Sequence, residues 1–291
     1  MTAAHRVDND GLKLALVEDG AGPDVLLVHG LGSAAEMWDD VVADLADRFR
    51  CSRLDLRGHG ASDRADRYLQ SGYASDVAAA LNHIGRPTVA VGHSLGGSAI
   101  AGVASEGHPL LHAAYIMDST LVRRPGAQST MTGVFVRIAE MLHEYQAAGR
   151  PVDDYVVWLA SQPYPGGVTV GEAFTPERLW GRAESLSLVD VGAIEAAIAG
   201  YPDEPPCAPA FAVPTRVAGA DPALGGSFTD GQLAGVLEHT PGLEFRRFEG
   251  VGHPMVMVQG FREPIVADVV EFLDRVFGGP LPRRHTVQSH D

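Results

Sequence analysis

Residues 92–96, Gly-His-Ser-Leu-Gly, form a pattern that can expose a single hydroxyl for chemistry. An apolar run, residues 87–91, precedes them, and a run of small residues, 97–104, follows. This order predicts a buried strand, a very tight turn and a helix. In such a turn Ser94 points away from the backbone, and the flanking glycines relieve the crowding. We therefore expect Ser94 to be a nucleophile in acyl transfer, in which a serine oxygen attacks a carbonyl carbon.

A serine nucleophile requires a base to take its proton and an acid to orient that base. His253 lies in a glycine-rich loop directly after the last predicted strand, where the chain can present its imidazole. Two aspartates are candidates for the acid because each follows an apolar strand. Asp221 is preferred, with Asp118 as the alternative acid. An ordinary turn residue before proline is the competing interpretation of Asp221.

The same chemistry requires hydrogen-bond donors for the negative charge that develops on the carbonyl oxygen. Residues 29–33, His-Gly-Leu-Gly-Ser, follow an early apolar strand and form a flexible glycine-rich loop. We expect an oxyanion hole made by the backbone N–H groups of Leu31, from this loop, and Leu95, at the start of the helix after Ser94. His29 is expected to be a structural hydrogen-bonding residue.

These residues are placed by strands and helices that alternate along most of the chain. Before residue 118 the apolar patterns predict strands and helices in turn, and the alternation resumes after residue 214. Such alternation predicts a mostly parallel, doubly wound α/β sheet. The predicted strands are residues 12–18, 25–28, 51–56, 87–91, 111–117, 215–218 and 243–248, and the predicted helices of this part are 34–48, 73–84, 97–104, 230–237 and 261–277.

The alternation breaks between residues 120 and 206, where no strand is predicted. Four helical stretches fill this segment, separated by proline and glycine: 134–147, 153–161, 176–186 and 191–199. The simplest organisation is an α/β core made of residues 1–119 and 207–278, with a helical insertion at 120–206. Residues 279–291 are expected to be a frayed tail.

The order Ser94, Asp221, His253, with the glycine-rich loop upstream, resembles the α/β-hydrolase superfamily. Residues 55–62 add to the resemblance, since they are similar to the loop after the fourth strand of that fold, with a structural role. The resemblance implies an eight-stranded, mostly parallel sheet with a helical cap at 120–206. One departure concerns the acid. Many relatives have a longer spacer between the glycine and the aspartate of the seventh strand, which keeps Asp118 open.

The resemblance also implies a reaction class. A carboxylic ester hydrolase (EC 3.1.1) acting on an ester or lactone is favoured, with apolar or aromatic substrates. A C–C bond hydrolase of a β-diketone or ring-cleavage product is the alternative, followed by a non-catalytic small-molecule receptor. Epoxide hydrolases and haloalkane dehalogenases of this fold carry aspartate at the elbow, so Ser94 argues against both.

Four apolar side chains are candidates for lining the substrate pocket: Met131, Phe135 and Trp158 in the predicted cap, and Met255 just after the base. Such residues often surround apolar ligands. The competing interpretation is that most of them pack inside the cap or between the cap and the core.

The overall composition and charge of the chain exclude some classes of binding partner. The chain has 291 residues, 45% of them hydrophobic, and a net charge of −15, which argues against nucleic acid and anionic membranes as partners. Cys51 and Cys207 suggest no disulfide framework. With a polar start and no long apolar run, a cytoplasmic enzyme is expected. We expect a small-molecule substrate, no metal and no organic cofactor; no pattern selects an oligomeric state.

Overall fold

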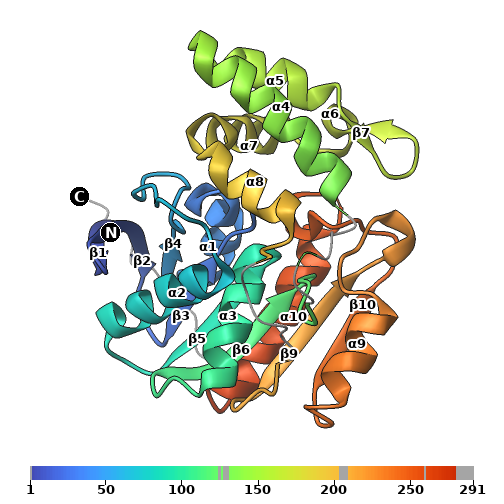
Figure 1. The fold of residues 1–291 in the computed structure, drawn as a ribbon. Helices are drawn as coiled ribbons and strands as arrows, with labels where there is room; N and C mark the ends of the chain where they lie inside the picture. Colours follow the sequence, from blue (N-terminus) through green and yellow to red (C-terminus); the bar gives the residue numbers. More distant parts are fainter. Residues whose placement is uncertain (1, 124–125, 127–130, 203–208, 259, 280–291) are drawn as a thin grey trace, which may run out of the picture.

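The centre of the molecule is an eight-stranded sheet in the order β1-β2-β4-β3-β5-β6-β9-β10 (Figure 1). The computed structural model describes residues 2–123, 126, 131–202, 209–258 and 260–279. Strands β1 and β2 pair antiparallel, as do β2 and β4, and every other pair in this sheet is parallel. The predicted fold class is therefore confirmed. The strands are β1 (Ala3–Asn9), β2 (Leu12–Gly20), β3 (Asp24–Val28), β4 (Arg50–Leu54), β5 (Thr88–His93), β6 (Leu111–Met117), β9 (Thr215–Ala220) and β10 (Glu244–Phe248).

Helices cover both faces of this sheet, which explains why its central strands are apolar throughout. Every residue of β3, β5 and β9 is buried. Helix α2 packs beside α3, and α10 packs beside α1, behind the sheet in Figure 1. The helices of this layer are α1 (Asp39–Leu45), α2 (Gln70–Ile84), α3 (Leu95–Glu106), α9 (Asp230–Leu237) and α10 (Arg262–Val276), with short 3₁₀ turns η1 (Ala35–Trp38), η2 (Pro222–Leu224) and η3 (Met255–Met257).

Two local differences separate the structure from the sequence prediction. Strand β1 was not predicted, because its inward-facing positions include the polar residues His5 and Asn9, which weakens the alternation of apolar and polar residues. The single helix predicted over residues 34–48 is instead a 3₁₀ turn, η1, followed by the shorter helix α1.

A layer of helices lies over one end of the sheet (Figure 1). It is formed by residues 132–199, and we call it the helical layer. Within it α4 packs on α8, and α5 packs on α7. The four predicted helices are present, and a short hairpin that was not predicted joins two of them. The elements are α4 (Thr132–Ala148), α5 (Val152–Ala160), β7 (Pro163–Tyr164), β8 (Val168–Thr169), α6 (Val170–Ala173), α7 (Pro176–Leu188) and α8 (Val191–Ala199).

The start and end of these helices follow from local sequence signals. The Thr175 side chain caps α7, and Pro176 occupies its first turn, where a missing N–H is harmless. Asp190 caps α8 by accepting from the Gly192 N–H, and Gly200 ends that helix in the left-handed conformation. These signals fix where α7 and α8 begin and where α8 ends, and α7 carries Arg182.

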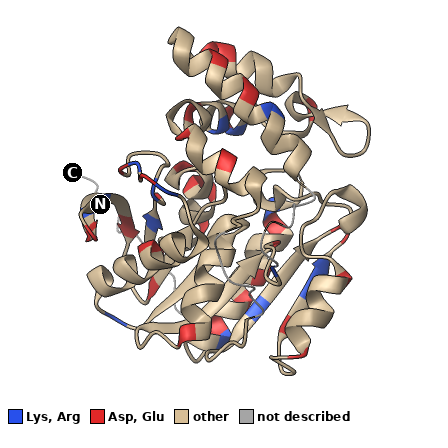
Figure 2. Cartoon of the chain, in the orientation of Figure 1, with Lys and Arg blue, Asp and Glu red and all other residues tan. Residues whose placement is uncertain are grey.

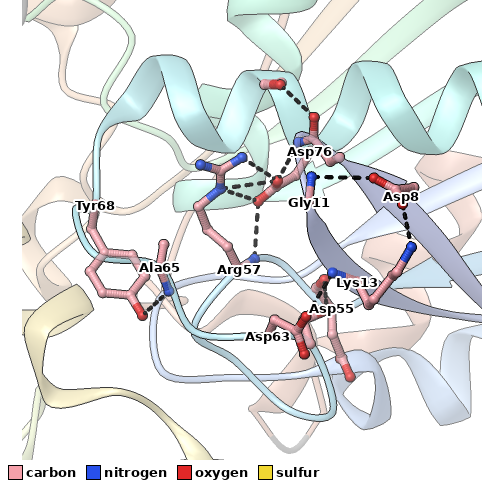
Figure 3. A network of polar contacts seen from close by, with 12 residues as sticks. Asp8, Gly11, Lys13, Asp55, Arg57, Asp63, Ala65, Tyr68 and Asp76 are labelled. Carbon is pink, nitrogen blue, oxygen red and sulfur yellow. Dashed lines mark hydrogen bonds and ion pairs between the residues drawn. The ribbon is translucent and has the colours of Figure 1, made fainter.

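The loop after β4, residues 55–62, is tied to the body of the protein by a polar network (Figure 3). Asp76, on α2 and inaccessible to solvent, accepts hydrogen bonds from the backbone N–H of Arg57 (3.0 Å) and from its guanidinium (2.7 Å at Nη2). Asp55 accepts from the N–H groups of Ala35 (2.7 Å) and Ala61 (2.9 Å). These contacts hold the loop against α2 and the start of η1.

Acidic residues are spread over both the sheet layer and the helical layer rather than gathered on one element (Figure 2). Among the described residues, no helix has both the length and the apolarity needed to cross a bilayer. Cys51 is a buried free thiol whose pKa burial raises to about 12, so it is inert as a nucleophile at neutral pH. Cys207 and residues 280–291 lie outside the described residues.

Candidate active site

Ser94 occupies the junction between β5 and α3 in a strained backbone conformation, with φ of 53° and ψ of −115°. A positive φ is unfavourable for a residue with a side chain, and such strain collects at functional sites. The turn is possible because Gly96 has no side chain. A Cβ there would lie 2.4 Å from the Val28 carbonyl oxygen and 2.5 Å from that of His29. The predicted strand, turn and helix are present, and the turn brings Ser94 to the carboxyl edge of the sheet.

Ser94 is in hydrogen-bond contact with His253, which is in contact with Asp118. The Ser94 hydroxyl lies 2.9 Å from His253 Nε2, and His253 Nδ1 lies 2.6 Å from Asp118 Oδ2. In this arrangement Nδ1–H donates to the carboxylate, which leaves Nε2 free to accept the serine proton. The three residues lie on a short path of polar contacts, although they are far apart in sequence.

Asp221 was predicted as the partner of His253, and the structure places it elsewhere. Its carboxylate accepts from the Ala223 N–H (2.9 Å) and from the Gly250 N–H (3.1 Å). Directly after β9 the chain turns into η2, and Asp221 caps that turn, so its side chain is used locally. The prediction of Asp221 as the acid was wrong in geometry. The alternative residue, Asp118, occupies the position instead.

Asp118 reaches His253 because its strand, β6, lies next to β5 and carries the carboxylate to the same edge as Ser94. It is fully buried and accepts three backbone N–H groups besides the histidine: Ala220 (3.0 Å), Ser227 (2.7 Å) and Phe228 (3.0 Å).

Burial alone would raise the pKa of Asp118. The hydrogen bond and charge of His253 and the N–H groups of Ser227 and Phe228 outweigh it and lower this pKa to about 2. Asp118 is therefore a carboxylate at neutral pH.

The loop that closes around Asp118 depends on a second glycine. A Cβ on Gly226 would lie 2.7 Å from the Ala220 carbonyl oxygen, so only glycine lets this loop fold back on the end of β9. The fold-back brings the backbone of Ser227 and Phe228 to the carboxylate. It also brings the Ser227 hydroxyl within 3.1 Å of His253 Nδ1. Nothing in the sequence marked Ser227, because it lies in an ordinary loop.

The two backbone groups predicted to hold an oxyanion are both unengaged. Neither the Leu31 N–H nor the Leu95 N–H donates to an acceptor in the described part of the chain. Leu95 is the first residue of α3, where N–H groups have no partner within the helix and the helix dipole favours negative charge. Leu31 and Ser94 line the same two cavities described below. Leu95 lines the smaller of the two, so Leu31, Ser94 and Leu95 share the wall of one cavity.

Two buried histidines support the loops around Ser94. His29 accepts from the Leu56 N–H through Nε2 (3.1 Å), and its Nδ1 donates to the Gly30 carbonyl (2.8 Å), as expected of a structural residue. His93 donates through Nε2 to the backbone carbonyl of His253 (2.8 Å) and fixes the position of that loop. Burial lowers the pKa of His29 to about 4 and that of His93 to about 3, so both are neutral.

Ser94 lies in the wall of two cavities. The larger, of about 460 Å³, lies between the helical layer and the sheet and is mostly apolar. The smaller, of about 190 Å³, has the charged side chain of Arg123 and polar groups from Gln70, Ser98, Thr120 and Gln232 in its wall. A molecule with its reacting carbon at Ser94 can therefore extend in two directions.

Three of the four predicted pocket residues line the larger cavity: Met131, Phe135 and Trp158. Met255 does not, and its prediction was wrong. It lies in η3 with no exposed surface and packs in the core, whereas its neighbours Pro254 and Met257 face the cavity. The reason is the period of the 3₁₀ turn, which points successive side chains in different directions.

In the part of the chain that the structure describes, no three histidine, cysteine, aspartate or glutamate side chains gather as a metal ion would need.

A sequence profile of the alpha/beta hydrolase family matches residues 25–268, which include most of the sheet, the helical layer and all of the residues above. The chain belongs to the alpha/beta hydrolase family. Within it, a segment of 119 residues is 33% identical to 2-(acetamidomethylene)succinate hydrolase of Mesorhizobium japonicum, covering 40% of this chain and 43% of that protein. The chain thus matches less than half the length of this curated relative.

Solved structures of alpha/beta hydrolases extend the likeness to the whole fold. The crystal structure of E-2-(acetamidomethylene)succinate hydrolase has a TM-score of 0.73 at 22% identity, covering 94% of this chain and all of that one. A thermophilic esterase from Thermogutta terrifontis, solved with malate bound, has a TM-score of 0.69 at 22% identity, covering 95% and 99%. At such identities the likeness concerns the fold.

Proposed function

We propose that this alpha/beta hydrolase is a serine hydrolase that cleaves a carboxylic ester or lactone through an acyl-enzyme on Ser94. The observation that carries the proposal is the pair of contacts Ser94 Oγ–His253 Nε2 (2.9 Å) and His253 Nδ1–Asp118 Oδ2 (2.6 Å). They supply a nucleophile, a base and an acid in hydrogen-bond reach of one another, as nucleophilic catalysis by serine requires. The elbow carries serine rather than the aspartate of epoxide hydrolases.

In the first half of the reaction, Ser94 Oγ attacks the substrate carbonyl while His253 Nε2 takes the hydroxyl proton. The carbonyl oxygen becomes an oxyanion, which the N–H groups of Leu31 and Leu95 stabilise by about 2.7–4 kcal/mol per donor. Asp118 holds the imidazole in the required tautomer and stabilises the imidazolium. The bond to the leaving oxygen then breaks, and His253 gives its proton to that oxygen.

In the second half, a water molecule attacks the acyl carbon of the acyl-enzyme, and His253 takes the water proton. The resulting oxyanion uses the same two N–H groups. Its collapse breaks the bond to Ser94 Oγ, which recovers its proton from His253 and releases the carboxylic acid. No redox step occurs, so the cycle needs only water as co-reactant.

Substrate size and polarity follow from the two cavities. The larger cavity is bounded by apolar side chains of the helical layer, among them Phe135, Trp158 and Phe174. We infer that the helical layer acts as a cap over the nucleophile and holds an apolar or aromatic part of the substrate. The smaller cavity then receives the other side of the scissile bond.

The decisive test is Ser94→Ala, assayed with short p-nitrophenyl esters and with a fluorophosphonate that labels activated serines. We expect kcat to fall by about 10⁴–10⁶-fold and labelling to disappear. A panel of esters, lactones and β-diketones then assigns the bond that is cleaved. Near-normal ester turnover by Ser94→Ala would refute the proposal, and preferential cleavage of β-diketones would replace it with C–C bond hydrolysis.

A further inference from the structure

An arginine of the helical layer lines the larger cavity. Arg182 lies on α7, in the helical layer, and lines that cavity together with Ser94 and His253. Its Nη1 donates to the Ser33 hydroxyl (2.8 Å) and its Nη2 to the Leu31 carbonyl (3.2 Å). Arg182 therefore touches the same loop whose Leu31 N–H is proposed to hold the oxyanion.

The charge of Arg182 has no ion-pair partner in the described part of the chain. Its two hydrogen bonds go to neutral acceptors, and no carboxylate oxygen of the described residues lies within 4.0 Å. Glu36 acts on it from a greater distance, but that carboxylate accepts from the Ser185 hydroxyl and the Ala34 N–H. Burial lowers the pKa of Arg182 to about 10, and the group is still a cation at neutral pH.

A second cation faces the same cavity from another helix. Arg137, on α4, is partly buried, and its guanidinium donates to the Gln162 side chain (3.3 Å) and to the Gly133 carbonyl (3.1 Å). Both acceptors are neutral, and no ion pair of Arg137 exists within the described ranges. No aspartate or glutamate is among the described residues that line the cavity. The larger cavity therefore has two arginines and no acidic residue among its described lining residues, in a protein of net charge −15.

A purely structural role does not account for the charge of Arg182. Hydrogen bonds to a serine hydroxyl and a backbone carbonyl can be made by a neutral amide, whereas an uncompensated cation loses hydration free energy when it is buried. Arg182 also has five N–H donors, of which the described residues accept from two, and its planar fork matches a carboxylate in two-point contact. The unused donors and the unpaired charge both indicate an anionic ligand.

We propose that Arg182, assisted by Arg137, forms a carboxylate subsite in the wall of the mostly apolar larger cavity and binds a carboxylate group of the substrate there. The inference rests on the proposed function, since it makes this carboxylate part of the molecule that Ser94 attacks. The preferred substrate is then an ester or lactone that carries a free carboxylate and has a short apolar chain between the two groups.

The shared contact with Leu31 limits how far the guanidinium can lie from the proposed oxyanion donor. Arg182 Nη2 is 3.2 Å from the Leu31 carbonyl oxygen, and the N–H of the same residue is the proposed oxyanion donor. Since the N and O atoms of one residue are about 3–4 Å apart, the guanidinium lies within about 7 Å of that donor. Because the two groups lie this close, one short molecule can reach both, and the test series is dicarboxylates of four to six carbon atoms: succinate, glutarate and adipate.

The experiment measures binding, so it does not depend on turnover. Succinate, glutarate and adipate are titrated into the full-length Ser94→Ala protein by calorimetry, with glutaramide as the uncharged counterpart of glutarate. We expect glutarate to bind and glutaramide to bind at least tenfold more weakly. Arg182→Gln and Arg137→Gln, in the same background, should each weaken glutarate binding, by about 10–100-fold for Arg182, as loss of a charged hydrogen-bond partner does.

Arg178→Gln is the matched control. Arg178 lies on α7 one turn before Arg182, pairs with Asp40 at 2.7 Å and does not line the cavity. Its loss removes the same charge from the same helix, and glutarate affinity should stay within twofold. A melting curve of each variant establishes whether it is folded. If Arg182→Gln does not fold, the test rests on Arg137→Gln, because Arg137 contacts neither Ser33 nor Leu31.

Several results would overturn the carboxylate subsite: no glutarate binding, equal binding of glutaramide, or unchanged affinity in Arg182→Gln or Arg137→Gln. Failure of the proposed function has a different signature. In that case glutarate binds in an Arg182-dependent way, while the wild-type protein cleaves neither neutral esters nor the half esters of these acids.

Discussion

Replacing Asp118 with asparagine separates the two aspartates that compete for the role of acid. The Asp118 carboxylate accepts four hydrogen bonds, and its Oδ2 receives two of them, from the Ser227 N–H (2.7 Å) and from His253 Nδ1 (2.6 Å). Asparagine can keep its oxygen toward Ala220 and Phe228. Its NH₂ group then faces the Ser227 N–H and His253 Nδ1. An NH₂ group is a donor, so it cannot accept the two hydrogen bonds that Oδ2 of the carboxylate accepts.

Two consequences have predictable sizes. The Ser227 N–H loses a charged acceptor, which should lower the free energy of unfolding by about 1.5–3 kcal/mol. His253 Nδ1 must accept from the amide, so its proton moves to Nε2, the atom that should take the proton of Ser94. A wrong tautomer of this kind lowers kcat by on the order of 10⁴-fold. The Ser227 hydroxyl, 3.1 Å from Nδ1, is the only other acceptor the described residues place there.

The assay compares Asp118→Asn with Asp221→Asn on one p-nitrophenyl ester, with unfolding in urea measured for both. Asparagine caps a helical turn as well as aspartate does, so Asp221→Asn should keep kcat within about threefold and lose less than about 1 kcal/mol of stability. The reasoning fails if the two variants exchange these outcomes, or if a folded Asp118→Asn keeps wild-type kcat.

Two further predictions concern the fold that supports the site. Gly96→Ala should destabilise the protein by at least about 1–3 kcal/mol, because its Cβ would lie 2.4 Å from a backbone oxygen; Gly133→Ala, on α4 with nothing within 4 Å, should be neutral or stabilising, and equal urea midpoints would contradict this. Stability should also fall on acidification. Burial lowers the pKa of His29 to about 4 and those of His59 and His93 to about 3, so the unfolded chain, with histidines near 6.5, binds more protons between these values. The contribution of these histidines to the free energy of unfolding is fully present above about pH 6.5 and is lost as the pH falls toward about 3. Each histidine accounts for up to about 1.4 kcal/mol per pH unit in this range. A constant urea midpoint from about pH 6.5 to about pH 4 would argue against neutral buried histidines.

The sequence predicted the elbow at Ser94 and the base at His253 because both depend on local order. An apolar strand followed by Gly-x-Ser-x-Gly and a run of small residues is the local pattern of a strand, a tight turn and a helix, and His253 follows the last predicted strand in a glycine-rich loop. The same local logic predicted the Leu31 and Leu95 N–H groups, since one lies in a glycine-rich loop and the other at a helix start. The unpredicted edge strand β1 shows the limit of this logic, because its more buried face includes the polar residues His5 and Asn9.

The local sequence pattern could not decide whether Asp118 or Asp221 contacts His253. Each aspartate follows an apolar strand, so the pattern along the chain is the same for both. What separates them is where the chain goes next: after β9 it turns at once and uses Asp221 as a cap, whereas Asp118 is left at the edge of β6 beside the end of β5. Met255 was misplaced for a similar reason, because a one-residue rotation in a 3₁₀ turn decides between cavity and core.

The order of most strands and helices and the positions of Ser94 and His253, the proposed nucleophile and base, were thus determined by the sequence itself, through hydrophobic periodicity and turn chemistry that act over a few residues. Tertiary structure alone decided which carboxylate meets His253 and that the charge of Arg182 is left without an ion-pair partner among the described residues. The physical reason is that a hydrogen bond or an ion pair depends on distances of about 3 Å between groups remote in sequence. Such distances are set by the packing of whole layers and not by any stretch of the chain.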